Sequence, residues 1–390
     1  MKVTFVSNYI NHHQIPLSDI LYRKWGDDYR FIQTQPMDEE RVRLGWNADS
    51  SQLSYVMQYT EEPETCRKLI LESDIVIFGG VDDESYIKER LEQGGIVLRY
   101  MERLYKEGQW KAVSPRGLVK KYKDHTRHNN APVYLLCAGG YVADDFNIIK
   151  AYKGKRFKWG YFPAFEESSE VDRAAWKEND CIRILWAGRF IDWKHPEDAL
   201  KVAGHLKEKG IEFQLTMAGG GEMETQLKAY AKEHKLEDCV EFAGFCKPER
   251  IREMMKRSNI YLFTSDYKEG WGAVLNEAMN SGCAVVASHA IGAVPFLLCH
   301  NQNGLIYQSG NVAELTELTE KLCKDSQLCD RLGQAAYEMI AEQWNPEYAG
   351  KVLIELCEGL IKGEVKFLDK GPLSEAKVIK QRQMYKYLHS

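Results

Sequence analysis

The chain has 390 residues, of which 44% are hydrophobic and 28% charged, and a formal net charge of -5 at pH 7. A single hydrophobic core rarely supports a chain of this length, and the composition excludes a disordered or fibrous protein. No apolar run reaches the about 18 residues of a transmembrane helix, and the ten cysteines show no zinc-type spacing. We therefore expect two domains, no metal cluster and a reducing, cytoplasmic setting.

The first part of the chain alternates short apolar runs with helical patterns. Its opening residues, Val3–Val6, indicate a buried strand and not a secretory leader. Patterns typical of helices follow at Glu61–Leu71 and Glu84–Gln93. Alternation of this kind predicts a mainly parallel sheet with helices on both faces. The other strands predicted here are Tyr29–Ile32, Asp74–Phe78, Gly95–Arg99 and Pro132–Cys137.

A basic stretch lies between Tyr105 and Gly160, with twelve Lys or Arg residues against four acidic ones. Such a stretch fits contact with phosphates, either on an anionic membrane or on a pyrophosphate-linked acceptor. It fits a solvated surface equally well. The sequence therefore leaves a peripheral membrane contact open.

A polar, acidic segment at 166–180 has the composition of a linker and separates the N-terminal domain, 1–165, from a second alternation. In that second domain, 181–365, a helix is expected at Pro196–Lys209, and two or three helices within Asn311–Leu360. A last segment, 366–390, contains an amphipathic helix that we expect to pack back on the N-terminal domain. The strands predicted here are Arg183–Ala187, Phe213–Met217, Val240–Phe242, Asn259–Phe263, Ala284–Ala287 and Leu305–Tyr307.

Two glycine signatures of nucleotide enzymes are missing from the sequence. No G-x-G-x-x-G follows the opening strand, and no G-x-x-x-x-G-K-[ST] occurs, which disfavours dinucleotide oxidoreductases and P-loop enzymes. The run Gly219-Gly220-Gly221 lies between a predicted strand and a helix. A tight turn explains it without a ligand.

The most informative stretch runs from Asn259 to Ser288. A buried strand leads into Glu269-Gly270-Trp271-Gly272, then into a helix from Ala273 to Asn280 that contains Glu277. The glycines let the backbone approach a ligand closely, and the helix start favours a diphosphate. Paired acids at an anion-binding helix suggest recognition of polyol hydroxyls, Glu269 for a sugar and Glu277 for a ribose. The alternative is a capping acid and a helix-surface acid.

Two basic residues follow the strand Arg183–Ala187. Arg189 and Lys194 belong to the loop that begins at Gly188, and at the carboxyl end of a strand they can neutralise a diphosphate and the charge it gains on leaving. Two solvated surface charges are the alternative.

These motifs, together with Ala284–Ser288 and Gly304-Leu305-Ile306, resemble the C-terminal domain of family 4 glycosyltransferases, retaining enzymes of the GT-B fold. The matching motifs cover about Gly188 to Tyr307. The resemblance implies two Rossmann-like domains facing each other across a cleft, with Arg189 and Lys194 on the diphosphate, Glu269 on the transferred sugar and Glu277 on the ribose. It further implies donor contacts at Gly188, Gly270, Trp271, Gly272 and Ala273, a base near Phe245, and no metal or other cofactor.

The chain also departs from the family pattern. His195 stands where the family often has Gly, and Gly292-Ala293-Val294-Pro295-Phe296 has Phe in place of the usual acid. The first loop, Asn8–Gln14, lacks the usual glycine pair. These departures leave the identity of the sugar open.

Candidates for the acceptor side lie in the N-terminal domain. His12 and His13 follow the first predicted strand, and Glu102 and Arg103 follow the strand Gly95–Arg99. Parallel strands present their following loops at one edge, which is where ligands bind in such sheets. All four are otherwise ordinary loop residues.

The resemblance thus implies a retaining, metal-independent transfer of a sugar from a nucleotide diphosphate, and we expect a UDP-sugar in preference to a GDP-sugar. The expected acceptor is a glycan or lipid-linked hydroxyl in bacterial polysaccharide assembly, and no nucleic acid partner is expected. The rivals are a nucleotide-sugar epimerase or hydrolase on the same fold, and a non-catalytic nucleotide-sugar sensor. The products formed from the donor alone would separate transfer from the first rival.

Overall fold

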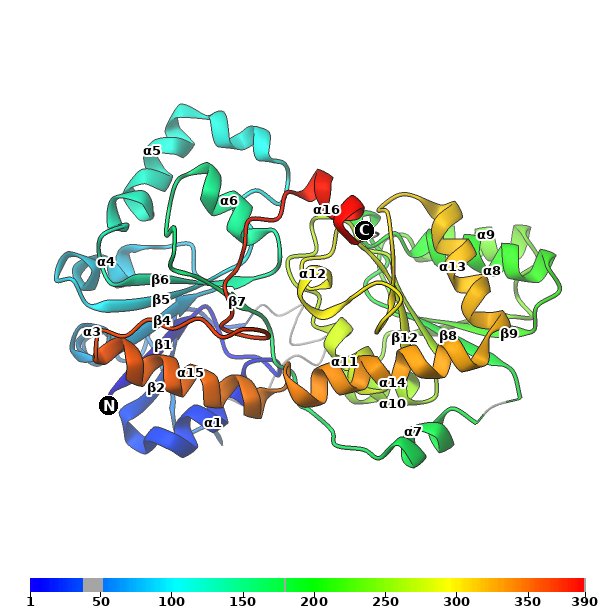
Figure 1. Cartoon of the computed structure of the whole chain (residues 1–390), viewed down its shortest axis with the longest axis horizontal. Helices are drawn as coiled ribbons and strands as arrows, with labels where there is room; N and C mark the ends of the chain where they lie inside the picture. Colours follow the sequence, from blue (N-terminus) through cyan, green and yellow to red (C-terminus); the bar gives the residue numbers. More distant parts are fainter. Residues whose placement is uncertain (38–51, 179, 389–390) are drawn as a thin grey trace. The chain divides into compact units, whose positions relative to one another are not determined.

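The computed structural model describes residues 1–37, 52–178 and 180–388, and it divides the chain into two compact units (Figure 1). Unit 1 comprises Met1–Ala164 and Gln343–Lys380, and unit 2 comprises Phe165–Glu342 and the residues from Gln381 onward. Each unit contains a parallel sheet whose strands alternate with helices. This confirms the predicted fold class of two doubly wound, Rossmann-like α/β domains.

The sheet of unit 1 has seven parallel strands in the order β3-β2-β1-β4-β5-β6-β7. The five strands that were predicted are all present, and their apolar residues are buried on both faces, as parallel sheets require. The strand order reverses between β1 and β4, so the loops after these two strands mark the switch point of the sheet. The strands are β1 (Val3–Ser7), β2 (Tyr29–Gln33), β3 (Val56–Gln58), β4 (Ile75–Gly79), β5 (Ile96–Met101), β6 (Val133–Ala138) and β7 (Arg156–Trp159).

The helices of unit 1 cover this sheet and include one from the far end of the chain. The helix α15 (Pro346–Ile361) packs on α1 (Ile15–Trp25) so closely that a Cβ on Gly350 would lie 2.5 Å from Cγ2 of Ile20. The other α-helices among the described residues of this unit are α3 (Pro63–Glu72), α4 (Ser85–Glu92), α5 (Pro115–Asp124) and α6 (Val142–Ile148).

The sheet of unit 2 has six parallel strands in the order β10-β9-β8-β11-β12-β13. All six were predicted. The order reverses between β8 and β11, so the loops that follow these two strands meet at the switch point of this sheet. The strands are β8 (Ile182–Ala187), β9 (Phe213–Ala218), β10 (Val240–Gly244), β11 (Ile260–Phe263), β12 (Ala284–Ser288) and β13 (Leu305–Tyr307).

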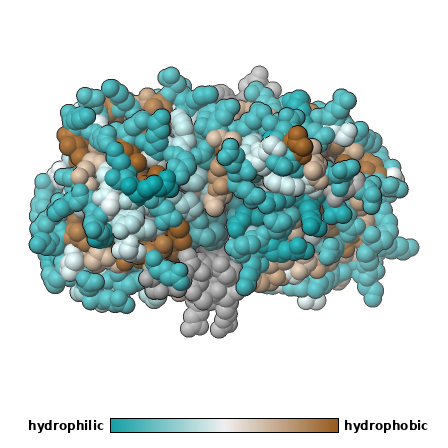
Figure 2. Space-filling model, turned by 90° about the horizontal axis from the view of Figure 1, so that it is seen from below, coloured by the Kyte–Doolittle hydropathy of each residue, from teal (hydrophilic) through white to brown (hydrophobic). Residues whose placement is uncertain are grey.

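The helices of unit 2 alternate with its strands, and the predicted helix after Pro196 is confirmed. No helix in the described part of the chain is long and apolar enough to cross a bilayer. The face drawn in Figure 2 is mostly hydrophilic, with apolar residues in small separate groups. The helices are α7 (Glu170–Trp176), α8 (Pro196–Glu208), α9 (Glu224–Glu233), α10 (Pro248–Lys256), α11 (Val274–Asn280), α12 (Val294–Leu297), α13 (Val312–Lys324), α14 (Ser326–Glu342) and α16 (Gln381–Leu388).

The unit boundaries differ from the predicted domains in two places. The segment 166–180 is not a free linker: it contains α7, and Arg173 donates to Gln334 Oε1 at 2.6 Å within unit 2. The helix α15, which was expected in the second domain, belongs to unit 1. In both cases the polar composition or helical pattern of the segment does not say which core it packs on.

The C-terminal segment, expected to pack on the N-terminal domain as a whole, is divided between the units. Its first part pairs with β7, where Lys158 N donates to Ser374 O at 2.8 Å and Ala376 N donates to Arg156 O at 3.0 Å. The helix α16 instead belongs to unit 2, where the Tyr385 hydroxyl donates to Glu314. The expectation for the helix was therefore wrong.

Candidate functional site

The loop after β8 is held by the glycine run after β9. A Cβ on Gly219 would lie 1.8 Å from the carbonyl oxygen of Gly188, and Phe190 N donates to Gly220 O at 2.9 Å. Gly219 and Gly221 both have positive φ angles, 145° and 154°. The glycine run is therefore explained by the close approach of two loops, in agreement with the interpretation that needed no ligand.

The loops after β8 and β11 are fastened to each other at the switch point. The Thr264 hydroxyl donates to Lys194 O at 2.6 Å and accepts a hydrogen bond from Trp186 Nε1 at 2.8 Å. Asp266 N donates to Trp193 O at 2.9 Å. The Thr264 hydroxyl and the main-chain bond of Asp266 therefore join the two loops within the protein itself.

This arrangement brings together two of the predicted site residues. Lys194 and Glu269, 75 residues apart in the chain, form a hydrogen-bonded ion pair. Their side chains are 15% and 12% exposed, so the pair is largely shielded from bulk water but not fully buried. A cation and a carboxylate at one point suit a ligand in which a phosphate adjoins a group of hydroxyls.

The turn Gly270–Gly272 packs tightly against the segment in which the chain departs from the family pattern. A Cβ on Gly292 would lie 1.7 Å from Gly270 O, and Gly292 N donates to Glu269 O at 3.2 Å. The Trp271 side chain is 1% exposed and donates to Asn276 Oδ1 at 2.9 Å. Trp271 was predicted to contact the donor, but its side chain is part of the core. Ala273, another predicted donor residue, directly precedes α11.

The second predicted acid, Glu277, lies on α11, with its side chain 9% exposed. Arg252 Nη1 on α10 donates to its carboxylate at 3.4 Å. Burial raises the pKa of Glu277 to about 7, and the nearby Arg252 offsets part of that rise. The helix α11 has seven residues, so the two loop cations, and not this short helix, carry the case for a diphosphate.

If the carboxylate of Glu277 accepts hydrogen bonds from a ribose, the affinity for a UDP-sugar should fall by roughly tenfold as the pH falls from about 8 to about 6. The raised pKa sets the sign: the group is ionised and can only accept above about 7, and it gains a proton below that value. A UDP-sugar is the probe because both of its phosphates are esterified and do not titrate in this range. Calorimetric titration at several pH values measures the effect.

Three variants give the controls for this pH dependence. Glu277→Gln should remove it, and Arg252→Ala should move its midpoint upward because a compensating cation is lost. Glu253→Gln changes an exposed acid on the same helix as Arg252 and should leave the profile as it is. A pH profile that is the same in the Glu277→Gln variant would rule out this role.

The other predicted donor residues lie on the neighbouring loops. Arg189 is exposed, with Cζ 5.9 Å from the centre of the Trp193 ring. Phe245 is 51% exposed just after β10, and the turn there is joined to the β9 loop by Gly219 N, which donates to Gly244 O at 2.8 Å. Loops of β8, β9 and β10 therefore follow one another at this edge of the sheet, with a cation at one end and an exposed aromatic ring at the other.

His195, at the position where the family that the sequence resembles often has glycine, has a left-handed backbone with φ 49°. This conformation favours glycine, but two carboxylates stabilise the histidine: Nδ1 lies 3.3 Å from Glu197 Oε1, and Nε2 lies 3.7 Å from Asp266 Oδ2. The adjacent carboxylates of Asp266 and Glu197 raise the pKa of His195 to about 10. The substitution thus places an imidazolium next to Lys194.

The same histidine belongs to a group that has the chemistry of a metal site. Ligand atoms of His195, Glu197 and Asp198 lie within 4.8 Å of one another. Both imidazole nitrogens already face carboxylates, and Asp198 accepts a hydrogen bond from Lys201 at 2.7 Å. A protonated imidazole is no ligand, so these residues do not fit a resident cation well.

A series of side-chain contacts that the sequence did not reveal connects α16 to the loop that contains Glu269. The ring of Tyr385 on α16 lies 5.9 Å from that of buried His289, centre to centre, and His289 Nε2 is 2.9 Å from the Tyr267 hydroxyl. Ser309 N donates to His289 Nδ1 at 2.9 Å. Since Nδ1 accepts, Nε2 carries the proton and donates to Tyr267, two residues before Glu269. A lone histidine after a strand gives no signal of this role.

The four acceptor-side candidates all lie in unit 1. His12 and His13 are half-buried after β1, with ring centres 3.8 Å apart. Glu102 is tied to Tyr161, whose hydroxyl donates to it at 2.8 Å, and to Lys106. These three remain candidates.

Arg103 has a different place. Its side chain is 2% exposed and pairs with fully buried Asp145 at 3.1 Å, and Tyr105 N donates to the same carboxylate at 3.1 Å. The geometry thus gives Arg103 a structural partner inside unit 1, which leaves its guanidinium little capacity for an acceptor.

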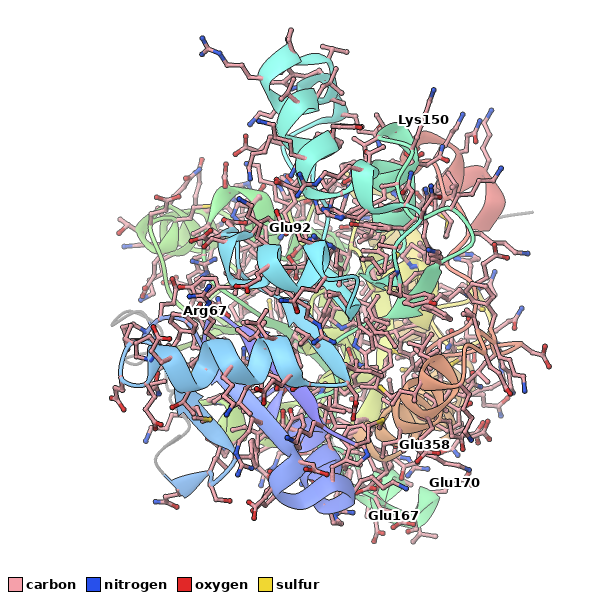
Figure 3. The ribbon with its side chains drawn as sticks, turned by 90° about the vertical axis from the view of Figure 1, so that its left-hand side faces the viewer. Arg67, Glu92, Lys150, Glu167, Glu170 and Glu358 are labelled. Atoms are coloured by element: carbon pink, nitrogen blue, oxygen red, sulfur yellow. The ribbon has the colours of Figure 1, made fainter. Side chains whose placement is uncertain are left out.

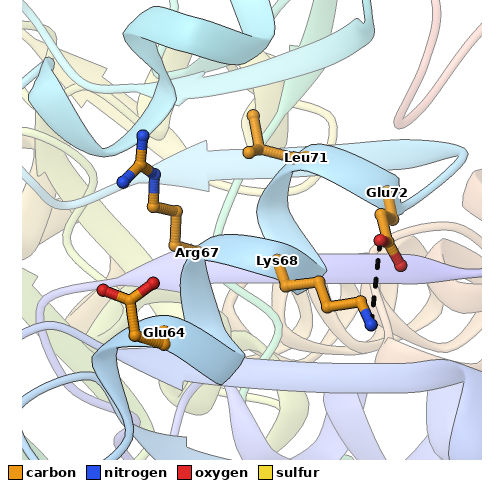
Figure 4. A pocket seen from close by; sticks show the side chains of 5 residues that line it. All are labelled: Glu64, Arg67, Lys68, Leu71 and Glu72. Carbon is orange, nitrogen blue, oxygen red and sulfur yellow. Dashed lines mark ion pairs between the residues drawn. The ribbon is translucent and has the colours of Figure 1, made fainter.

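A surface pocket elsewhere in unit 1 is not part of this site. Figure 4 shows that its lining comes from a single helix, α3, with an ion pair between Lys68 and Glu72 at 3.9 Å. None of the predicted site residues lines it. Its charged groups are exposed and solvated, so we give it no role.

Residues 168–339 match the family described as Glycosyl transferases group 1. Over 184 residues the chain is 30% identical to the amylovoran biosynthesis glycosyltransferase AmsK of Erwinia amylovora, and the match covers 46% of this chain and 45% of that protein. It is 28% identical over 164 residues to the N-acetyl-alpha-D-glucosaminyl L-malate synthase of Bacillus anthracis, with 42% of each covered. The match thus spans less than half the length of these relatives.

Solved structures extend the likeness to more than nine-tenths of the chain. The Anabaena protein Alr3699/HepE, solved in complex with UDP, aligns with a TM-score of 0.70 and 16% identity over 91% of this chain and 99% of that one. The sucrose-phosphate synthase of Thermosynechococcus elongatus aligns with a TM-score of 0.65 and 16% identity, over 93% and 100%. These structural neighbours are GT-B glycosyltransferases, and at such identity the likeness shows the fold.

Proposed function

We propose that this protein is a glycosyltransferase that moves a sugar from a nucleotide diphosphate donor, bound in unit 2, to an acceptor hydroxyl. The observation that carries the proposal is the ion pair between Lys194 and Glu269 at the switch point of the unit 2 sheet. The pair joins a phosphate-binding group to a hydroxyl-binding group, which is what the junction between diphosphate and sugar requires. The matched family region, 168–339, contains both residues and supports the same conclusion.

In this proposal Arg189 and Lys194 bind the diphosphate, Glu269 binds the sugar hydroxyls, Glu277 binds the ribose and Phe245 stacks on the base. A UDP-sugar is favoured over a GDP-sugar. The UDP bound to the structural neighbour from Anabaena supports the choice, although it is a property of that protein.

We further propose that the transfer retains the anomeric configuration. The bond between the anomeric carbon and the phosphate oxygen breaks, and the electron pair leaves with the diphosphate. A phosphate oxygen accepts the proton of the acceptor hydroxyl on the same face, where the new glycosidic bond forms. Arg189 and Lys194 then stabilise a charge that grows during the reaction, which is the interaction that accelerates it.

The acceptor in this proposal is a glycan or a lipid-linked hydroxyl, with His12, His13 and Glu102 on the acceptor side. A relative named for amylovoran biosynthesis supports a role in bacterial polysaccharide assembly. The basic stretch between Tyr105 and Gly160 fits a peripheral contact with an anionic membrane.

Activity should survive an excess of chelator. The proposal assigns the neutralisation of the leaving group to Arg189 and Lys194. The nearby acids are engaged by basic side chains: Glu269 with Lys194, Asp198 with Lys201 and Glu197 with His195. Turnover is measured with EDTA and again after Mg²⁺ or Mn²⁺ is added. A rate that falls to background with the chelator and returns with the metal would contradict the metal-independent mechanism.

A thermal-shift screen against nucleotide sugars, followed by product analysis, tests the proposal as a whole. A bound donor should raise the unfolding temperature by mass action, and UDP-sugars should raise it most. The selected donor is then incubated with and without acceptor glycans. Transfer to an acceptor supports the proposal, whereas epimerised or hydrolysed donor alone, or binding with no turnover, would replace it by one of the rivals.

A further inference from the structure

The helix α5 of unit 1 has no buried residue, which distinguishes it from the other helices of its length. Figure 1 shows it standing apart from the unit 1 sheet. Five of the eleven large apolar side chains that are exposed in the described part of the chain lie on α5 or in the short turn before it. They are Trp110 (70% exposed), Val113 (77%), Leu118 (44%), Val119 (55%) and Tyr122 (58%).

These side chains and the charges around them have the order of an interfacial helix. Leu118, Val119 and Tyr122 have i, i+1 and i+4 spacing, so they share one face of α5. Basic side chains flank this face, whereas the acid Asp124 pairs with Lys120 at 2.8 Å away from it. The basic residues between Trp110 and Arg127 are Lys111, Arg116, Lys120, Lys121, Lys123 and Arg127.

Two basic residues in the later part of the stretch, Lys155 and Arg156, make structural contacts within unit 1. Arg156 is buried and donates to the carbonyl oxygens of Ala143 and Ala151 at 3.1 Å and 2.5 Å. Lys155 donates to Ala131 O at 2.7 Å. Lys150, labelled in Figure 3, is exposed in the same unit. Exposed basic side chains therefore lie both on α5 and near Lys150, and those on α5 and in the turn before it are the ones that adjoin the exposed apolar side chains.

We propose that α5 and the preceding turn, residues 110–123, dock on an anionic phospholipid surface. Exposed Trp and Tyr rings with Leu and Val insert at the boundary of headgroups and acyl chains, and the lysines bind the lipid phosphates. The combination of apolar side chains with an excess of positive charge favours this surface over a second copy of the chain, which would bring like charges together. This proposal specifies the membrane contact that is part of the proposed function. Its biological role rests on the proposed function, whereas the exposed apolar and basic side chains of α5 do not depend on it.

Vesicle sedimentation tests the proposal with the full chain. The protein should bind vesicles of phosphatidylcholine mixed with phosphatidylglycerol, bind poorly to phosphatidylcholine alone, and release at high salt because the ionic part of the attraction is screened. The triple variant Leu118→Ser, Val119→Ser, Tyr122→Ser removes the apolar face. The triple variant Lys120→Gln, Lys121→Gln, Lys123→Gln should lower the affinity on the order of a hundredfold, since each lysine contributes about fivefold.

A matched variant controls for total charge: Lys209→Gln, Lys232→Gln, Lys351→Gln removes three exposed lysines elsewhere and should keep most of the binding. Thermal unfolding should be nearly unchanged in all three variants because the altered side chains are exposed, except for the partly buried Lys121. The proposal is overturned if the original protein does not bind anionic vesicles, or if the serine variant and the Lys120, Lys121, Lys123 variant bind them as well as the original protein does. If sedimentation velocity shows a dimer for the original protein and a monomer for the triple serine variant, the partner of this surface is a second copy of the chain and not a lipid.

The outcomes for this proposal and for the proposed function can be told apart. Donor binding is measured on the same preparations by calorimetry without lipid. A protein that binds UDP-sugar and not vesicles keeps its proposed function and loses the docking surface. A protein that binds vesicles and no nucleotide sugar does the opposite.

Discussion

Glu269→Ala should lower turnover by at least about a hundredfold while the affinity for the free nucleoside diphosphate stays within about 0.5 kcal/mol of the original value or increases. The carboxylate faces the sugar in the proposed function, so its loss should be felt when the sugar departs. Since its structural partner is Lys194, removing it also frees a cation for the diphosphate. Calorimetric titration with UDP and steady-state kinetics with the donor measure the two effects separately.

Glu269→Gln and Lys268→Ala serve as controls. The amide keeps the size of the side chain and loses its charge, so it should retain binding and recover little turnover. Lys268 is the adjacent exposed residue, 3.8 Å from Asp192, and its loss should change little. If Glu269→Ala loses UDP binding, or keeps full turnover, Glu269 does not have the proposed role of contacting the transferred sugar.

The fold could be predicted because its strands are buried on both faces. Runs such as Ile75–Phe78 and Ala284–Ala287 are continuous apolar segments between turn residues, and this pattern has few other solutions. The two strands that the sequence did not predict, β3 and β7, lack this continuous apolar pattern. β3 has three half-buried residues, and β7 alternates Arg156 and Lys158 with aromatic residues, so it reads as part of a basic stretch.

The unit boundaries could not be predicted because they depend on contacts between distant parts of the chain. Asn345 caps α15 and Pro346 opens it, which are local signals that a helix begins there. Nothing local says that its Gly350 packs against Ile20 of the first unit. The same holds for α16, whose place in unit 2 depends on Tyr385 reaching Glu314.

The site was predictable to the extent that the main chain determines it. Lys194 and Glu269 follow strands on either side of a switch point, so the order of strands is enough to bring them together. Residue type alone could not separate a contact residue from a core residue. Trp271 is buried against Asn276, and Arg103 is paired with Asp145, although both types are common at ligand sites.

The two loop cations should have large effects on binding and larger ones on catalysis. Arg189→Ala and Lys194→Ala should each weaken the binding of a nucleoside diphosphate by about 1.5–3 kcal/mol, the range for hydrogen bonds to charged groups. Turnover should fall further because negative charge on the diphosphate grows as the sugar leaves. Calorimetry with UDP and steady-state kinetics of both variants measure the two quantities.

The two residues should differ in how they respond to substitution. Arg189→Lys should restore only part of the function if the guanidinium holds two phosphate oxygens at once, because an ammonium group cannot reproduce that fork. Lys194→Ala leaves the half-buried carboxylate of Glu269 without its partner, so part of its cost is repulsion between this acid and the diphosphate. The double variant Lys194→Ala, Glu269→Ala should therefore bind UDP more tightly than Lys194→Ala alone.

This double-variant cycle decides what the ion pair does. If Lys194 only neutralises Glu269, the double variant should bind UDP as the original protein does. If Lys194 contacts the diphosphate directly, a deficit of about 1 kcal/mol or more should remain after the repulsion is removed. If neither cation contacts the diphosphate, both single variants should instead change UDP affinity by no more than about 0.5 kcal/mol and keep near-normal turnover, as expected for Lys268→Ala. That result would remove the electrostatic support for a diphosphate at this edge of the sheet.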